Sequence, residues 1–296
     1  MVTLLTGILE QGLIYAFLAL GVYISFQVLN FADLTVDGSF ALGGAVVAMM
    51  LSKQLSPMLA ILVAFIFGML AGSLTGTLHV YFGITDFLAG TIVQIGLYTI
   101  NLWLAGGSYV TFYEAKTIFH NDFIDSLFAN LSFSTRAIIV SALLLFVVKA
   151  ILDFFFSTKA GLLLRATGEN AILVNSLAVD PGKEKIKGLA LANGLAALSG
   201  AVLVQQQAYF DISMGTGVMV MGLASIIIGL RVFKKLTWMQ ASTMAMFGSI
   251  LYKAILALAI RLGLPAEALK LAIAVILFVV LLSPKRAKKR GKYVKN

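Results

Sequence analysis

Long apolar segments are the feature that most constrains how this chain can fold. A bilayer core about 30 Å thick is crossed by a helix of about 20 mostly apolar residues. Segments of about this length recur at residues 4–29, 36–52, 57–81, 84–105, 136–156, 187–208, 215–230, 238–260 and 266–283. Of the 296 residues, 60% are hydrophobic and only 12% are charged, whereas about 25% are charged in soluble domains. The sequence therefore predicts an all-α polytopic transmembrane protein with about nine spans, roughly eight to ten by length, in one membrane domain over residues 1–284.

Basic residues indicate which loops face the cytoplasm. Fifteen of the 22 Lys and Arg residues lie at 159–187, 231–235 and 285–295, and two predicted spans separate each segment from the next. Cytoplasmic loops are enriched in Lys and Arg. We therefore expect a multi-pass protein of the cell (inner or plasma) membrane, with a cytoplasmic segment at 157–187, a basic cytoplasmic tail at 285–296 and an external loop at 106–135. Nine spans place the N-terminus outside, and an extra break within residues 1–52 would place it inside.

A weak internal repeat marks two breaks between apolar segments. Residues 31–38 and 209–217 both read aromatic, any residue, Asp, aliphatic, hydroxyl and then glycine, and they include Asp33, Asp37 and Asp211. Repeats with interrupted hydrophobic segments build the substrate path of many transporters, since a free helix end offers unpaired N–H or C=O groups to a polar ligand. Unpaired acids inside a membrane are costly and usually face a cavity or a partner. The alternative is that Asp33 and Asp37 only cap the helix predicted at 36–52.

Polar side chains within the apolar spans are the other candidates for a substrate path. Thr91, Gln94, Tyr98 and Asn101 follow helical spacing along one face of the span at 84–105. Hydrogen bonding between helices is the alternative role for any single one of them. The predicted translocation pathway contains Asn30, Asp33, Asp37, Thr91, Gln94, Tyr98, Asn101, Asn193 and Asp211. Lys253 lies inside the span at 238–260 and needs an acid, a carbonyl or the interface to accommodate its charge, but the sequence identifies no partner.

The cytoplasmic segment 157–187 is too polar to span and is patterned like a helix. Thr167 or Gly168 can begin a short helix with Glu169 in its first turn. Ile172, Leu173 and Leu177 then share one face. Such an amphipathic helix either docks a partner or lies on the lipid interface.

Four stretches of the chain carry a resemblance to a known family. They are Ala166–Asn170, Gly188–Ala201, Gly222–Gly229 and Leu29–Phe40. Taken in their order along the chain, they resemble the permeases of the branched-chain amino acid and ribose ABC importer superfamily, and in particular a subgroup of tryptophan/tyrosine uptake permeases that work with a solute-binding protein.

The resemblance implies a set of partners and a coupling site. It implies a homodimer of permease chains, two copies of a separate ATPase that binds ATP and Mg²⁺, and an external solute-binding protein that delivers a small polar nutrient, taken to be an amino acid. The residues that would couple to the ATPase are Arg165, Thr167, Gly168, Glu169, Asn170, Ile172, Leu173 and Leu177.

Absent motifs narrow the possible functions. The sequence contains no phosphate-binding loop of the GxxxxGK[ST] type, no HExxH motif and no nucleophile elbow, so we expect no enzyme activity and no bound cofactor. The absence of cysteine excludes thiolate metal sites and disulfides. The basic residues lie at membrane edges, which argues against a nucleic-acid partner. The main alternative is a carrier driven by an ion gradient, with Asp33, Asp37, Lys253 and His79 as charge carriers; a channel or a structural membrane protein is a weaker one.

Overall fold

The computed structural model describes residues 2–128 and 131–263, together with residues 271, 275 and 278. Within these residues, eight helical segments are long and apolar enough to cross a membrane: 4–28, 35–52, 57–82, 86–105, 133–157, 181–207, 212–232 and 241–261. The predicted polytopic all-α fold is therefore confirmed. The ninth predicted span, 266–283, and the basic tail at 285–296 lie outside the described residues.

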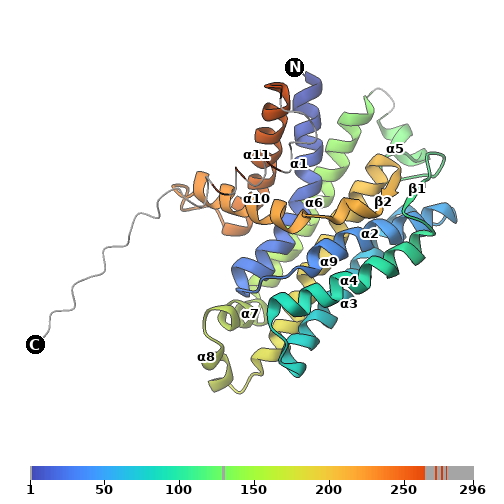
Figure 1. Ribbon diagram of the computed structural model, residues 1–296. Helices are drawn as coiled ribbons and strands as arrows, with labels where there is room; N and C mark the ends of the chain where they lie inside the picture. The colour runs from blue at the N-terminus through green and yellow to red at the C-terminus, as the bar shows by residue number, and fades with distance from the viewer. Residues whose placement is uncertain (1, 129–130, 264–270, 272–274, 276–277, 279–296) are drawn as a thin grey trace, which may run out of the picture.

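The elements follow one another mostly as long helices joined by short turns (Figure 1). In chain order they are α1 (Val2–Val22), the π-helix η1 (Tyr23–Val28), α2 (Thr35–Ser52), α3 (Pro57–Phe82), α4 (Asp86–Ala105), β1 (Tyr109–Thr111), α5 (Asp122–Leu127), α6 (Phe133–Ser157), α7 (Lys159–Glu169), α8 (Ala171–Ser176), α9 (Pro181–Gln207), β2 (Tyr209–Asp211), the 3₁₀-helix η2 (Ile212–Gly215), α10 (Val218–Val232) and α11 (Ala241–Arg261).

Local sequence signals explain where the helices begin and end. Pro57 and Pro181 occupy the first helical positions of α3 and α9, where the missing N–H of proline costs nothing. The carboxylate of Asp180 accepts a hydrogen bond from the Gly182 N–H and caps α9. Gly83, which ends α3, has φ +67°, a left-handed conformation that glycine adopts without strain.

The helix α9 is the centre of the bundle. Nearly all of its spanning part is buried, and it packs against α1, α2 and α3. Small residues permit this close approach: a Cβ on Gly72 of α3 would lie 2.1 Å from the Leu189 carbonyl oxygen, and one on Gly43 of α2 would lie 1.9 Å from that of Ala197. Helices in lipid associate largely through such close packing.

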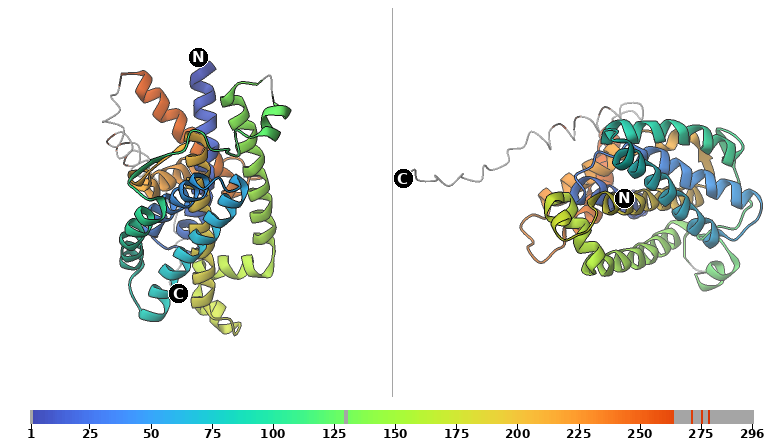
Figure 2. Two further views of the ribbon diagram at one scale, coloured as in Figure 1. Left: turned by 90° about the vertical axis from the view of Figure 1, so that its right-hand side faces the viewer. Right: turned by 90° about the horizontal axis from the view of Figure 1, so that it is seen from below.

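The two ends of the bundle carry different structures. The helices α7 and α8 lie at one end, and β1 and α5 lie at the other (Figures 1 and 2). The strands β1 and β2 pair antiparallel, with Tyr109 opposite Asp211 and Thr111 opposite Tyr209. This pairing holds the loop after α4 against the turn after α9. The start of α1 lies at this end as well (Figures 1 and 2).

Candidate functional site

The break between α1 and α2 contains the first of the predicted acids. The chain leaves α1 through the π-helix η1, turns at Asn30 with φ +54° and re-enters a helix at Thr35. Asp33, which is fully buried, accepts hydrogen bonds from the Thr35 N–H at 2.9 Å and from Asn193 Nδ2 at 2.6 Å. Asp33 thus accepts the N–H of the first residue of α2 and also joins α2 to α9.

Buried hydrogen bonds around Asn193 bind three helices together. Ser39 Oγ donates to Asn193 Oδ1 at 2.7 Å, and Asn193 Nδ2 also donates to the Leu189 carbonyl at 3.0 Å. The hydroxyls of Thr35 and Thr75 lie 2.6 Å apart and connect α2 to α3. A polar group buried in hydrocarbon is stable only when it is paired. Asp33 and Asn193 therefore serve helix packing in this structure and do not line either of the two cavities described below.

The two similar stretches of the repeat adopt the same local turn. Asp33 Oδ1 accepts from the N–H two residues later, at Thr35, and Asp211 Oδ1 accepts from the N–H two residues later, at Ser213. Each turn precedes a helical segment, α2 in the first case and η2 in the second. The Asp–x–hydroxyl pattern is thus a helix-entry signal that the chain uses twice.

Asp37 brings the two stretches into contact. Its carboxylate oxygens accept hydrogen bonds from the backbone N–H groups of Gly217 at 2.9 Å and Met219 at 2.7 Å, which form the N-terminus of α10. A carboxylate at a helix N-terminus satisfies free N–H groups and interacts favourably with the helix dipole. Asp37 therefore caps a helix from the other half of the chain and not its own helix α2.

A small cavity lies beside this contact. It has a volume of about 60 Å³ and is lined by Asp37, Gly38, Ala41, Gln94, Tyr98, Asn101, Ile212, Gly215 and Thr216. Three members of the predicted stripe on α4 therefore meet a predicted acid across the space between α2 and η2. Thr91, the fourth member, does not line the cavity, and its hydroxyl donates to the Phe87 carbonyl of its own helix at 2.8 Å.

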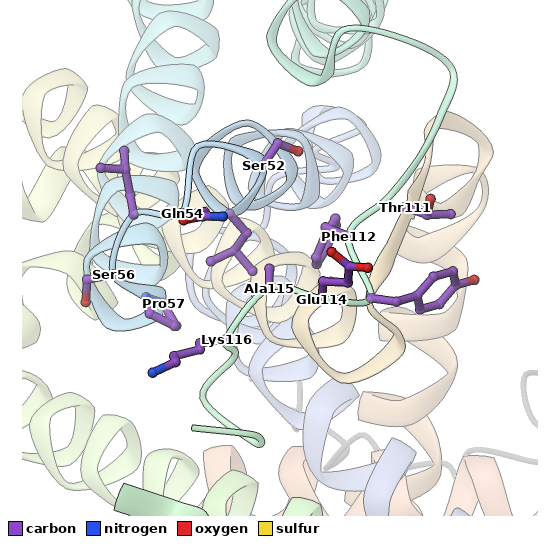
Figure 3. A pocket seen from close by; sticks show the side chains of 12 residues that line it. Ser52, Gln54, Ser56, Pro57, Thr111, Phe112, Glu114, Ala115 and Lys116 are labelled. Carbon is purple, nitrogen blue, oxygen red and sulfur yellow. The ribbon is translucent and has the colours of Figure 1, made fainter. Parts of the chain in front are cut away.

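A larger cavity lies at the end of the bundle that carries β1. It has a volume of about 1030 Å³, between the turn from α2 to α3 and residues 111–116. Figure 3 shows Gln54, Ser56 and Pro57 on one side of it and Glu114 on the other, with the Lys116 side chain extending toward Pro57. The sequence did not predict this cavity, because it is formed by two loops that are distant in the chain and have no shared pattern.

The segment 157–187 contains two short helices in place of the single helix expected. Thr167 and Gly168 lie at the end of α7 and not at the start of a helix, and Glu169 is the last residue of α7. Asn170 begins the second helix, α8, by accepting a hydrogen bond from the Leu173 N–H at 3.1 Å. The predicted apolar face is present: Ile172 is 84% exposed, Leu173 51% and Leu177, just after α8, 59%.

The end of α7 rests on the end of η1. A Cβ on Gly168 would lie 1.7 Å from the carbonyl oxygen of Val28, the last residue of η1. Thr167 is buried, and the Arg165 guanidinium lies 4.6 Å from the centre of the Phe156 ring of α6. Thr167 and Gly168 therefore contact the membrane helices, while the other predicted coupling residues are exposed and within reach of a partner: Arg165, Glu169, Asn170, Ile172, Leu173 and Leu177.

Lys253 finds partners on α1. Its ammonium nitrogen lies 3.6 Å from the centre of the Tyr15 ring and donates to Gln11 Oε1 at 3.2 Å. Both contacts are neutral groups, which stabilise a buried ammonium by cation–π attraction and hydrogen bonding. Lys253 forms no ion pair with an acid among the residues that the structure describes.

Comparison with known proteins identifies a family whose model matches nearly the whole chain. Residues 4–282 match the model of the family described as branched-chain amino acid transport system / permease component. The chain is 36% identical over 275 residues to a tyrosine transport system permease protein of Clostridioides difficile (strain R20291), covering 93% of this chain and 89% of that protein. It is 30% identical over 282 residues to the uncharacterized protein RP368 of Rickettsia prowazekii (strain Madrid E), covering 94% and 96% of the two chains. No solved structure matches the chain.

Proposed function

This chain belongs to the family of permease components of branched-chain amino acid transport systems, and from that premise we propose that it is the membrane subunit of an ATP-driven importer of an aromatic amino acid. The name of the Clostridioides relative, a tyrosine transport system permease protein, makes tyrosine the first substrate to test. The chain itself binds no nucleotide in this proposal; ATP and Mg²⁺ are bound by two copies of a separate ATPase.

The exposed apolar face of α8 is the observation that carries the ATP-driven mechanism. Ile172, Leu173 and Leu177 are all more than half exposed, whereas Val174 of the same helix is fully buried and anchors it to the bundle. A short helix held by one side chain and presenting apolar residues at the end of the molecule suits a groove in a partner. The basic segment 159–187 contains α7 and α8, and cytoplasmic loops are enriched in Lys and Arg, which favours a cytoplasmic location for this end.

The small cavity between α2, α4 and η2 is proposed as part of the substrate path. Tyr98 is 54% exposed on α4, so the cavity borders a surface that a second copy of this chain would cover in a homodimer. The ring of Tyr98 offers an apolar surface and a hydroxyl to an aromatic substrate.

The opposite end is proposed to receive a solute-binding protein. The exposed loop there carries ion pairs of Lys116 with Asp122 and of Arg136 with Asp125. The Lys116 ammonium lowers the pKa of Asp122 below its ordinary value, so this carboxylate remains charged on the surface. The larger cavity beside this loop lies where a released amino acid would enter.

Reconstitution tests the proposed energy source. The chain, purified with its ATPase, should take up tyrosine into proteoliposomes when the binding protein and ATP are supplied, and the charge substitution Ile172→Glu should lower ATPase association at least tenfold. Leu131→Glu, an exposed leucine at the opposite end, is the matched control and should leave association unchanged. Uptake by the permease alone, driven by a sodium or proton gradient without ATP, would establish the carrier alternative instead.

A further inference from the structure

The side-chain amide of Asn101 has a fixed orientation and an unused acceptor. Its Nδ2 donates to the Gly38 carbonyl oxygen at 3.2 Å. Turning the amide over would bring Oδ1 against that carbonyl, and two acceptors repel each other. Oδ1 therefore points away from Gly38, and it has no hydrogen-bond partner although Asn101 is only 1% exposed. A buried acceptor without a donor is unfavourable, and in native structures it calls for a ligand or water.

The charge around this atom is negative. Asn101 and Asp37 line the same cavity of about 60 Å³. The carboxylate of Asp37 accepts backbone N–H groups at the start of α10, including those of Gly217 and Met219. A carboxylate has about four acceptor positions, so Asp37 retains capacity for a further donor. The N–H groups of Gly217 and Met219 are already occupied by Asp37, so they offer little to an anion. None of the nine described lining residues is Lys, Arg or His.

Size and charge together select the occupant. A cavity of about 60 Å³ holds a few water molecules or one small polar group, but not a whole amino acid. An ammonium group brings three N–H donors and a positive charge, which match the Asn101 oxygen and the Asp37 carboxylate. A carboxylate would be repelled by both. We propose that this cavity binds the ammonium group of the transported amino acid, with the remainder of the substrate lying along α4 beside Tyr98.

Cysteine labelling tests the charge preference without any transport reaction. The natural chain has no cysteine, so a single Thr216→Cys variant places one thiol at the cavity. The full chain in membrane vesicles is treated with aminoethyl methanethiosulfonate, which carries an ammonium group, or with the anionic sulfonatoethyl reagent. The ratio of the two rates is divided by the same ratio at Thr111→Cys, which lines the larger cavity together with one acid, Glu114, and one base, Lys116. This division corrects for the intrinsic reactivity of the reagents.

We expect the corrected ratio to favour the cationic reagent at least tenfold. Adding Asn101→Leu should reduce this preference at least threefold, Asn101→Asp should restore or increase it, and methylammonium should slow the reaction more than an equal concentration of potassium. A corrected ratio near one, a preference that is unchanged in Asn101→Leu, or equal protection by potassium and methylammonium would overturn the proposal. Tyr98→Cys, at the same cavity, provides the second reporter if Thr216→Cys does not accumulate in the membrane.

The ammonium site takes the identity of its amino acid from the proposed function, so the two proposals need separate tests. Substrate analogues provide them. In the reconstituted importer, tyramine, which lacks the carboxylate, should compete with tyrosine, whereas 3-(4-hydroxyphenyl)propionate, which lacks the amine, should compete at least tenfold less well. Equal competition by both analogues would refute ammonium recognition while leaving tyrosine import intact. Absence of tyrosine uptake together with a preserved labelling preference would refute the proposed substrate and retain the ammonium site.

Discussion

Asp37 is the residue through which the two similar stretches of the chain meet. It supplies both acceptors for the N–H groups of Gly217 and Met219 at the start of α10. In Asp37→Asn one of these acceptors becomes an NH₂ group that faces an N–H, so we expect a loss of about 1–2 kcal/mol of stability, measured by chemical unfolding in detergent. Asp180→Asn is the matched control: Asp180 accepts one N–H, from Gly182, and Asn retains that acceptor, so stability should change by less than about 0.5 kcal/mol. Equal effects of the two substitutions would contradict the double cap.

Lys253 allows a test of the carrier alternative at a single residue. Its ammonium group contacts the Tyr15 ring and the Gln11 amide, both uncharged, and the side chain is 7% exposed. Replacing a buried charge by an apolar side chain of similar length is often neutral or stabilising. Lys253→Met should therefore keep tyrosine uptake within about twofold of the natural protein and should not lower the unfolding midpoint. Complete loss of uptake with normal folding would indicate that the charge takes part in transport.

Sequence periodicity predicted some of the site and missed the remainder for identifiable reasons. Helical spacing placed Gln94, Tyr98 and Asn101 on one face of α4, and all three line the small cavity. Spacing along one helix cannot reveal contacts between distant segments, so the bond from Asn193 to Asp33, 160 positions apart in the chain, was not predicted. Only tertiary contacts of this kind reveal whether a polar residue joins helices or lines a cavity.

At the scale of elements, the contact between α7 and η1 provides a route from the docking segment to the membrane. The end of η1 leads directly into the break that holds Asp33, and a π-helical turn is often found at functional sites. A Cβ on Gly168 would lie 1.7 Å from the Val28 carbonyl oxygen, so Gly168→Ala must displace α7 from η1. We expect ATP hydrolysis to continue while tyrosine uptake per ATP falls at least fivefold, measured in the same proteoliposomes.

A second glycine provides the control for this coupling prediction. A Cβ on Gly107, in the loop after α4, would have its nearest contact at 3.7 Å, an ordinary van der Waals distance. Gly107→Ala should leave uptake per ATP unchanged. If tyrosine uptake per ATP is the same in Gly168→Ala as in Gly107→Ala, then the contact between α7 and η1 serves only helix packing and does not couple ATP hydrolysis to transport.

The boundary of α7 shows where element prediction from sequence was wrong. The sequence pattern predicted a helix start at Thr167 or Gly168. The helix begins instead after Thr158, whose hydroxyl accepts a hydrogen bond from the Gly161 N–H. Thr167 instead bonds back to the Leu163 carbonyl within α7. The run from Lys159 to Leu164 is helix-forming, and a capping residue before such a run is the stronger start signal. The pattern of Ile172, Leu173 and Leu177 survives this error because all three follow Asn170, which begins α8.

At the scale of the whole molecule, the order of the spans was the most predictable property. Each described span begins and ends within a few residues of its predicted bounds, apart from the start of α9 at Pro181, because apolar length and Pro or Gly at the breaks both act locally. Which end faces the cytoplasm is a different kind of prediction. It depends on the distribution of Lys and Arg relative to the membrane potential and lipid charge, not on contacts within the fold.

Accessibility of single cysteines tests that orientation in the intact cell. Ser176, at the end of α8, and Ser132, which caps α6 at the opposite end of the bundle, are both exposed serines. In a chain without natural cysteine, a membrane-impermeant maleimide should label Ser132→Cys from outside within minutes and label Ser176→Cys only after the membrane is opened. The substitution is nearly isosteric at exposed positions, so insertion should be unaffected. The reverse labelling pattern would place α8 outside the cell, where no ATP-hydrolysing partner could reach it, and the importer mechanism proposed for this chain would have to be abandoned.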